Sequence, residues 1–195
     1  MGYRRILAVI DVQNIYFEKG SPLRCRSADR ALSNINQLIN GAQRAGDQVV
    51  YFRHVHKKDQ SDLGRMFDFT GVTEEPNFME GTRDVEYRNG LAILPEAKHF
   101  IKNRYSAFTN RDFSQFLSDS AATTIAVCGF MTNYCCDSTT RDAHDLDLYV
   151  DFILDATGCP DIDRSIKEEQ IKKVVGATLS GGFARVVSTK AYLKS

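Results

Sequence analysis

Short and almost continuous apolar runs alternate with helical patterns along most of this chain. The runs fall at 5–10 (R-I-L-A-V-I), 48–53, within 97–103, and at 123–128, 147–154 and 185–188. Runs without regular polar alternation are typical of strands that are buried on both faces of a sheet. Helical patterns cover 27–45, 111–118, 132–144 and 163–179. Strands that alternate with helices predict an α/β fold, a three-layer doubly wound sandwich around a parallel sheet.

The clearest helical pattern lies at 27–45, where apolar residues recur at three- and four-residue spacing. Ser27 is a good N-cap for this helix, and Gly46 is a good C-terminal stop. The segment 54–95 is different, because it is only weakly periodic and longer than an ordinary connection. We expect it to be a lid or an excursion with short helices.

The length of 195 residues favours one domain, which we expect to span residues 1–195. The chain has 25 Lys and Arg against 25 Asp and Glu, so its formal net charge is zero. Nucleic-acid affinity comes largely from neutralising phosphates, so this balance argues against a nucleic-acid binder that works by bulk charge. A charge near zero permits oligomers without showing them.

Two features bear on the compartment. The first apolar run, at 6–10, is too short for a signal-peptide core or a membrane span, so we expect a cytoplasmic protein without membrane attachment. The five cysteines are an odd number and contain no Cys-x-x-Cys pair. We therefore expect neither a disulfide framework nor a zinc knuckle, and at least one thiol needs another explanation.

Chemically active side chains follow three of the expected strands. Asp11 comes directly after the first strand, Lys102 ends the strand within 97–103, and Cys135 follows the strand at 123–128 near the start of the next helix. Ligands of parallel α/β sheets bind outside the carboxyl ends of the strands. These three groups are therefore expected to meet at one edge of the sheet.

Together the three groups suit acyl transfer from an amide. A helix N-terminus and the Lys102 cation are expected to lower the pKa of the Cys135 thiol, and Asp11 can accept its proton and later donate it. Backbone N–H groups between Phe130 and Cys135 can hold the oxyanion. Each residue also has a simpler interpretation. Cys135 could be an inert thiol of the core, Asp11 a helix cap, and Lys102 a solvated lysine on the surface.

Several segments, taken in order, resemble the isochorismatase-like cysteine hydrolase family over nearly the whole chain. They are A-V-I-D-V-Q-N at 8–14, E-G-T at 80–82, K-N-R-Y-S-A-F at 102–108 and G-F-M-T-N-Y-C at 129–135. The resemblance implies a six-stranded, mainly parallel sheet, a homo-oligomer such as a dimer or tetramer, and a catalytic triad of Asp11, Lys102 and Cys135. It also implies a non-proline cis peptide between Phe130 and Met131, which with Cys135 would form the oxyanion hole.

The resemblance also separates branches of the family. Nicotinamidase-like members hold a divalent metal through an Asp-x-His and a further His. Here His54 and His56 stand at the first motif and Asn77 replaces the later His. Two imidazoles without a third strong ligand make a poor zinc site, so we expect no metal and no other cofactor.

Cys135 favours the branch that hydrolyses amides, because isochorismatases proper cleave a vinyl ether and lack this cysteine. We therefore expect a cysteine hydrolase acting on a small amide, ureido or carbamoyl compound. The alternatives are an isochorismatase-type vinyl-ether hydrolase and a non-catalytic binding subunit with the same fold. The expected substrate is a small acidic or polar molecule. The residues expected to bind it are Gln13, Tyr16, Arg53, His54, Tyr105, Phe108 and Tyr134, with His56, Arg83, Arg104 and Met131 as further candidates. Among them the Arg and His side chains are expected to supply cationic contacts, and the aromatic side chains and Met131 an apolar wall.

Overall fold

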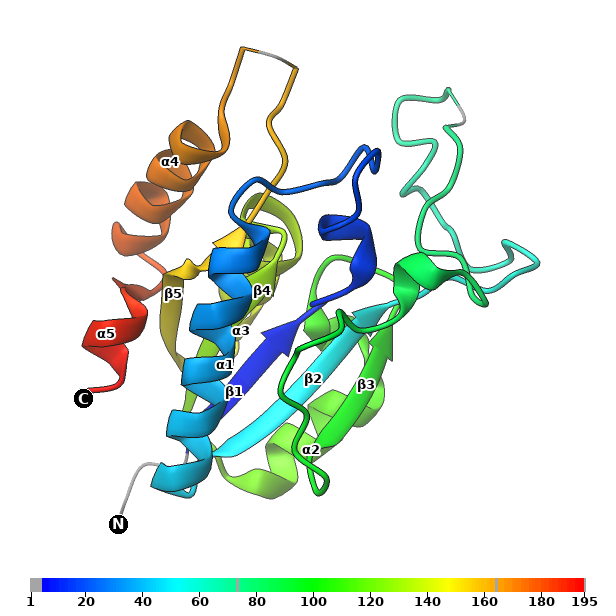
Figure 1. Cartoon of the computed structure of the whole chain (residues 1–195). Helices are drawn as coiled ribbons and strands as arrows, with labels where there is room; N and C mark the ends of the chain where they lie inside the picture. The colour runs from blue at the N-terminus through cyan, green and yellow to red at the C-terminus, as the bar shows by residue number, and fades with distance from the viewer. Residues whose placement is uncertain (1–4, 73, 164, 195) are drawn as a thin grey trace.

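A single six-stranded sheet forms the centre of the computed structural model, which describes residues 5–72, 74–163 and 165–194 (Figure 1). The strand order is β3-β2-β1-β4-β5-β6, and every neighbouring pair is parallel. The expected α/β fold is therefore confirmed, with all six strands parallel. The strands are β1 (Arg5–Ile10), β2 (Gln48–His54), β3 (Lys98–Lys102), β4 (Thr124–Phe130), β5 (Tyr149–Gly158) and β6 (Arg185–Val187).

Helices cover both faces of this sheet, which gives the three layers. Alternate residues of β1 point to opposite faces, so Leu7 and Val9 share one apolar cluster while Ile6, Ala8 and Ile10 share another. The first cluster includes residues of α1 (Ala28–Ala45) and α5 (Thr189–Tyr192), and the second those of α2 (Arg111–Ser120) and α3 (Asp137–Asp145). The helix α4 (Glu168–Ser180) contributes to both clusters.

The strand order reverses direction between β1 and β4. From β1 the chain builds outward through β2 to β3, and it then crosses to β4, β5 and β6 on the other side. Two connections leave the sheet in opposite directions at this point, and ligands of open parallel α/β sheets commonly bind at such a place. Asp11 follows β1, and the segment leading to Cys135 follows β4.

Two of the expected helices differ from the structure. The helix expected at 132–144 begins as a π-helical turn, Thr132–Cys136, before α3 continues it. The helix expected at 163–179 begins only at Glu168. Ser27 does precede α1, but its side chain caps no backbone N–H group of that helix. Its hydroxyl instead hydrogen-bonds Glu168 of α4, a partner far away in the sequence.

The excursion at 54–95 returns to the end of the sheet where β1 stops. Its described residues include a short 3-10 helix, η2 (Arg83–Val85), and isolated bridges join Gln13 to Tyr87 and His56 to Met79. Another 3-10 turn, η1 (Asn14–Tyr16), follows Asp11. Backbone hydrogen bonds connect this excursion to the strand ends, at Asn14 N to Glu86 O and at Arg88 N to Val12 O.

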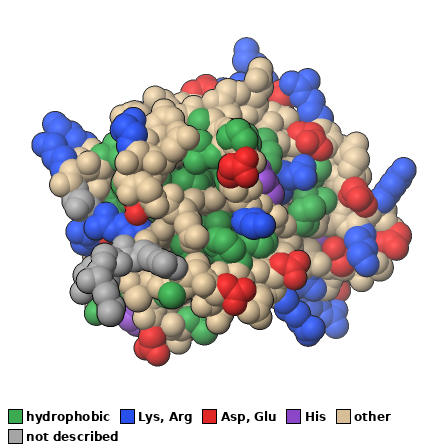
Figure 2. Space-filling model, turned by 90° about the horizontal axis from the view of Figure 1, so that it is seen from below, with side chains coloured by type: hydrophobic (Ala, Val, Ile, Leu, Met, Phe, Trp, Pro, Cys, Tyr) green, Lys and Arg blue, Asp and Glu red, His purple; other side chains and the backbone are tan. Residues whose placement is uncertain are grey.

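The surface carries charges of both signs. Figure 2 views the molecule from the end at which the strands begin, and Lys and Arg side chains are interspersed there with Asp and Glu and with hydrophobic side chains. This agrees with the equal numbers of acidic and basic residues. Within the described residues, the helices are all too short or too polar to cross a lipid bilayer.

Candidate active site

The carboxyl ends of β1 and β4 pair directly, and Gly129 leaves no room for a side chain there. Ile10 and Gly129 are paired in the parallel register. Gly129 has φ of +121°, and a Cβ atom there would lie 1.9 Å from the carbonyl oxygen of Ile10. Only glycine fits this position, because it alone tolerates such a φ without a clashing side chain. Asp11, with φ of 48°, then turns the chain out of β1.

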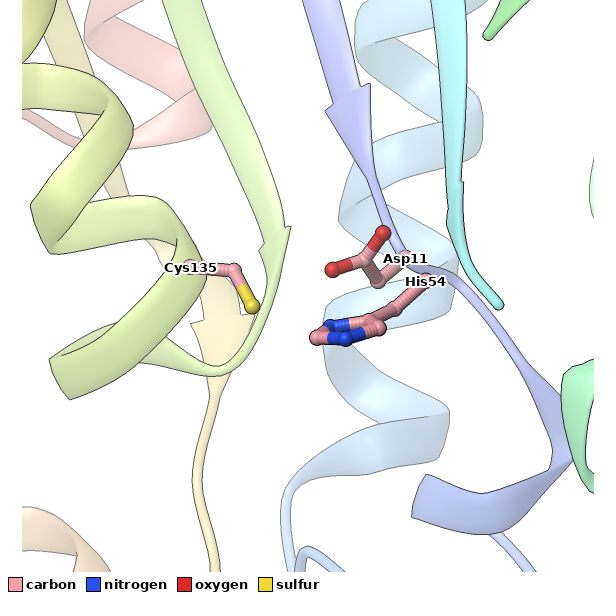
Figure 3. Close-up of side chains that lie close together, drawn as sticks. All are labelled: Asp11, His54 and Cys135. Carbon is pink, nitrogen blue, oxygen red and sulfur yellow. The ribbon is translucent and has the colours of Figure 1, made fainter. Parts of the chain in front are cut away.

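Cys135 lies in the turn that follows β4. The peptide bond between Phe130 and Met131 is cis, at the place where the resemblance implied one. The N–H groups of Tyr134 and Cys136 both donate to the carbonyl oxygen of Met131, which closes the π-helical turn. Figure 3 shows the Cys135 sulfur pointing from this turn toward the Asp11 carboxylate and the His54 ring.

Lys102 reaches the same place from β3, two strands away from β1. Its Nζ atom lies 2.7 Å from Asp11 Oδ2, 3.0 Å from the carbonyl oxygen of Arg104 and 3.5 Å from His54 Nδ1. An ammonium group has three N–H donors, and besides these three acceptors Cys135 also lies within hydrogen-bonding reach of it. The three residues expected to act as a triad are therefore brought together, although their catalytic role stays a prediction.

Burial dominates the electrostatics of this cluster. Asp11, Lys102 and Cys135 are each at most 2% exposed. Burial raises the pKa of Asp11, while the Lys102 ammonium opposes the rise. Burial also acts to lower the pKa of Lys102, but the Asp11 carboxylate and Cys135 outweigh it, so that pKa is raised. Lys102 therefore stays protonated.

The thiol does not behave as the sequence suggested. Burial raises the pKa of Cys135 to about 12, even though the Lys102 ammonium acts to lower it. The expected lowering fails because desolvation penalises a thiolate more than one partly neutralised cation stabilises it. Cys135 is therefore a thiol at rest and needs a neighbouring base to become a nucleophile.

His54 lies closer to the triad than the sequence indicated. The ligand atoms of Asp11, His54 and Cys135 all lie within 4.8 Å of one another. Burial, the Lys102 charge and His56 hold the pKa of His54 well below its ordinary value. Burial likewise lowers the pKa of His56, although Asp62 opposes it. Both rings are therefore neutral near pH 7, which corrects the expectation that they supply cationic contacts.

This donor set does not fit a divalent metal. His54 Nε2 and His56 Nε2 lie 3.0 Å apart and face each other directly. The Lys102 ammonium is already in contact with the Asp11 carboxylate and 3.5 Å from the other nitrogen of His54. A metal cation next to these donors would face an ammonium group at short range, and such like charges repel strongly in a buried site.

Three of the residues expected to bind substrate line the same region. The Tyr16 ring stacks on Phe130 with centroids 5.0 Å apart, and its buried hydroxyl group has no hydrogen-bond partner among the described residues. Tyr105 and Tyr134 pack together with centroids 5.1 Å apart, and Tyr134 is partly exposed beside Cys135. Met131, a further candidate, is buried and directly precedes the π-helical turn that holds Cys135.

The side chains of the other expected binding residues have partners outside the triad, although the Arg104 carbonyl oxygen contacts Lys102. The Gln13 amide donates to the carbonyl oxygens of His54 and Val85 and accepts from the N–H of His54, so it joins backbone segments. Arg53 forms an ion pair with Glu86 at 3.4 Å. Phe108 packs against Phe113 of α2, Arg83 pairs with Glu18, and Arg104 donates to the backbone of Asp62.

One residue of this region had no signal in the sequence. Asp62 lies 3.4 Å from His56 Nδ1, measured to its Oδ1 atom. It is one of several acidic residues in a weakly periodic segment, and only the fold shows which of them meets a histidine. The His-x-His spacing at the end of β2 was visible, but its acidic partner was not.

This chain is similar to known proteins in both sequence and structure. A family model described as the isochorismatase domain matches residues 5–190. An uncharacterised isochorismatase family protein of Bacillus subtilis is 26% identical over 191 residues, which cover 96% of this chain and 98% of that protein. The structure of a cysteine hydrolase from Pseudomonas syringae superposes with a TM-score of 0.89 at 27% identity, covering 98% of this chain and 91% of the other.

Two further relatives carry more specific names. The ureidoacrylate amidohydrolase RutB of Azorhizobium caulinodans is 28% identical over 169 residues, covering 77% of this chain and 74% of that enzyme. A probable inactive nicotinamidase of Arabidopsis thaliana is 30% identical over 155 residues, covering 77% of this chain and 79% of that protein. The relatives thus include an amide-cleaving enzyme and a protein named as inactive.

Proposed function

Since this chain belongs to the isochorismatase family of hydrolases, we propose that it is a cysteine hydrolase of small amide, ureido or carbamoyl compounds. The observation that carries the proposal is the buried group of Asp11, Lys102 and Cys135, in which Lys102 Nζ lies 2.7 Å from the carboxylate and Cys135 lies beside it. The similarity to a ureidoacrylate amidohydrolase supports the amide class.

In the proposed reaction Asp11 accepts the Cys135 proton while the sulfur attacks the substrate carbonyl. Because burial raises the pKa of Asp11, its carboxylate is a stronger base than an exposed aspartate. Lys102 keeps that carboxylate ionised in the resting protein by direct pairing. The oxyanion is assigned to backbone N–H groups of the turn formed by Phe130, Met131 and Cys135.

Collapse of the adduct breaks the carbon–nitrogen bond, and Asp11 passes its proton to the departing amine. The product of this half-reaction is a thioester on Cys135. Asp11 then accepts a proton from water as the water oxygen attacks the thioester. The thiolate leaves and takes that proton back from Asp11, which restores the resting protein and releases the acid.

A screen of small amides, ureas and carbamates, read by ammonia and amine release, tests the proposal. Cys135→Ala should lower turnover at least about 1000-fold, because no other group can form the thioester. Cys136→Ala, a change of another buried cysteine in the same turn, is the matched control and should keep most of the activity. Chelation with EDTA should leave turnover intact. Full activity of Cys135→Ala would eliminate the proposal.

Two other functions remain as alternatives. An isochorismatase-type vinyl-ether hydrolase needs no thiol, so turnover of isochorismate by Cys135→Ala would favour it. A non-catalytic binding subunit is favoured by one observation, the similarity to a probable inactive nicotinamidase. Binding of a panel compound without turnover, in a protein with all three residues of the triad intact, would support that function.

A further inference from the structure

A line of polar contacts connects the triad with the surface. Lys102 Nζ lies 3.5 Å from His54 Nδ1, His54 Nε2 lies 3.0 Å from His56 Nε2, and His56 Nδ1 lies 3.4 Å from Asp62 Oδ1. We call these four residues the histidine network. His54 and His56 are buried, whereas Asp62 borders an open cavity of about 360 Å³. The proposed mechanism uses only the first of the four.

The ammonium end of this network fixes the direction of its first hydrogen bond. Lys102 is paired with Asp11 and carries three N–H donors, and it has no lone pair with which to accept. At this contact His54 Nδ1 can only accept from Lys102, so we infer that it bears no proton. A neutral imidazole has one proton, which consequently resides on His54 Nε2.

The remaining contacts follow from this assignment. His54 Nε2 faces His56 Nε2 at 3.0 Å, and only one of the two can carry a proton between them. With the proton on His54, His56 Nε2 accepts and the His56 proton lies on Nδ1. That N–H group lies 3.4 Å from Asp62 Oδ1, within ion-pair range but without ideal hydrogen-bond geometry, and an ionised carboxylate can only accept.

The contacts of Asp62, at the other end of the network, indicate the same direction for the hydrogen bonds. Asp62 Oδ1 accepts from the backbone N–H of Lys57, and Oδ2 accepts from the Asn103 amide. Burial opposes ionisation of Asp62, but these hydrogen bonds and His56 hold its pKa below the ordinary value. Asp62 is therefore an acceptor, which places the His56 proton on Nδ1. Both ends of the network thus assign one and the same pair of tautomers.

We propose that His56 and Asp62 are positioning residues that hold His54 in its Nε2–H tautomer and thereby keep Lys102 directed at Asp11. In the opposite tautomer, His54 Nδ1–H would point at the Lys102 ammonium, and two donors would oppose each other in a buried site. Relief of that conflict would move Lys102 away from Asp11. The effect on turnover rests on the function proposed above, whereas the tautomers do not.

Nitrogen-15 labelling of histidine tests the tautomers without any substrate. The chain has four histidines, so the spectrum is simple to assign with single His→Phe variants. Between about pH 6 and 8, His54 should show a protonated Nε2 and a bare Nδ1, and His56 the reverse. Either ring in the other tautomer, or two rings in the same tautomer, would overturn the proposal whether or not a substrate is known.

Kinetics on an amide found by the screen test the positioning role. His56→Phe keeps an aromatic ring against Phe67, with which His56 now packs at 5.5 Å, but removes both nitrogens. Displacement of a catalytic group by about 1 Å can cost about 100-fold in rate, so kcat should fall roughly 10- to 100-fold while KM changes less than about threefold. His56→Gln should recover much of the loss, because its amide oxygen can accept from His54 Nε2.

The controls separate positioning from general damage. His99→Phe changes a histidine that stacks on Tyr51 outside the network, and it should retain full activity. Asp62→Ala should lower kcat to a similar extent. Its nitrogen-15 spectrum should also show that the tautomer of His56 has changed. Unchanged kcat in both His56→Phe and Asp62→Ala would overturn the positioning role. Since wild-type tautomers are read directly, misfolding of one variant leaves the proposal testable.

Discussion

The Tyr16 hydroxyl group is buried without a hydrogen-bond partner among the described residues. An unpaired buried hydroxyl costs roughly 1–3 kcal/mol. The ring itself is well packed, stacked on Phe130 and tilted against Phe78. A phenylalanine would keep this packing without the cost, so the hydroxyl is best explained as a group that hydrogen-bonds substrate.

Tyr16→Phe should therefore stabilise the free protein by about 1 kcal/mol and raise KM several-fold. Urea unfolding and steady-state kinetics measure the two effects. Tyr51→Phe is the matched control, since the Tyr51 hydroxyl donates to Ala92 O and accepts from Leu94 N. That variant should lose stability and keep its KM. Equal stability losses in both variants would contradict our explanation.

The pH dependence of activity follows from Asp11. Burial raises its pKa above the ordinary 3.8, and the reaction needs the ionised carboxylate. Activity is thus lost as the pH falls through the raised pKa, and the acid limb of kcat/KM should have its midpoint above 3.8. Rates from about pH 3.5 to 9, with circular dichroism to verify folding, measure it. A midpoint at or below the ordinary value would show that Asp11 is not the base.

At the scale of elements, the strands could be predicted from local sequence and the connections could not. A strand buried on both faces is apolar whatever surrounds it, so the runs at 5–10 and 123–128 predict β1 and β4 directly. Asp11, Lys102 and Cys135 could be placed together because parallel strands share one carboxyl edge. Gln13 and Arg53 could not be placed, because their partners come from Val85 and Glu86 in the irregular excursion.

Glu168 is a second residue whose structural role depends on long-range contacts and could not be predicted from local sequence. Its buried carboxylate accepts from the N–H and hydroxyl groups of Ser27 and from the N–H of Cys159. It therefore joins the start of α1, the end of β5 and the start of α4. No local pattern distinguishes it from Glu169, which is exposed one residue later.

Glu168→Ala should destabilise the protein by about 2–4 kcal/mol, because it leaves buried N–H and hydroxyl groups without their acceptor. Glu169→Ala, on the same helical turn, should change stability by less than about 0.5 kcal/mol. Urea unfolding of both variants measures the difference. Similar stabilities would show that Ser27 and Cys159 find other acceptors.

At the scale of the whole molecule, large apolar side chains lie on the surface of the excursion. Phe69 is 70% exposed and Val72 is 68% exposed. Exposed apolar patches often mark contacts between proteins, and we predict that this protein is a homo-oligomer. Light scattering should give a mass above the 21.9 kDa of one chain.

The variant Phe69→Ser with Val72→Ser should shift that mass toward a single chain. Val174→Ser changes an exposed residue of α4, which lies outside the excursion, and should leave the mass unchanged. A wild-type protein that sediments as one chain at micromolar concentration would contradict this assembly. The excursion would then be a surface segment with no neighbour.

The burial of Asp11, His54, Lys102 and Cys135 has a kinetic consequence. In this form the Asp11 carboxylate and the Cys135 thiol are shielded from solvent, so we expect capture of a substrate to wait for an opening fluctuation. The second-order rate constant then reflects the fraction of time the protein is open, and it lies well below the diffusional ceiling of about 10⁸–10⁹ M⁻¹s⁻¹. Added viscogen should leave this second-order rate constant nearly unchanged. A rate constant that falls in proportion to viscosity would mean that the site is usually accessible to substrate.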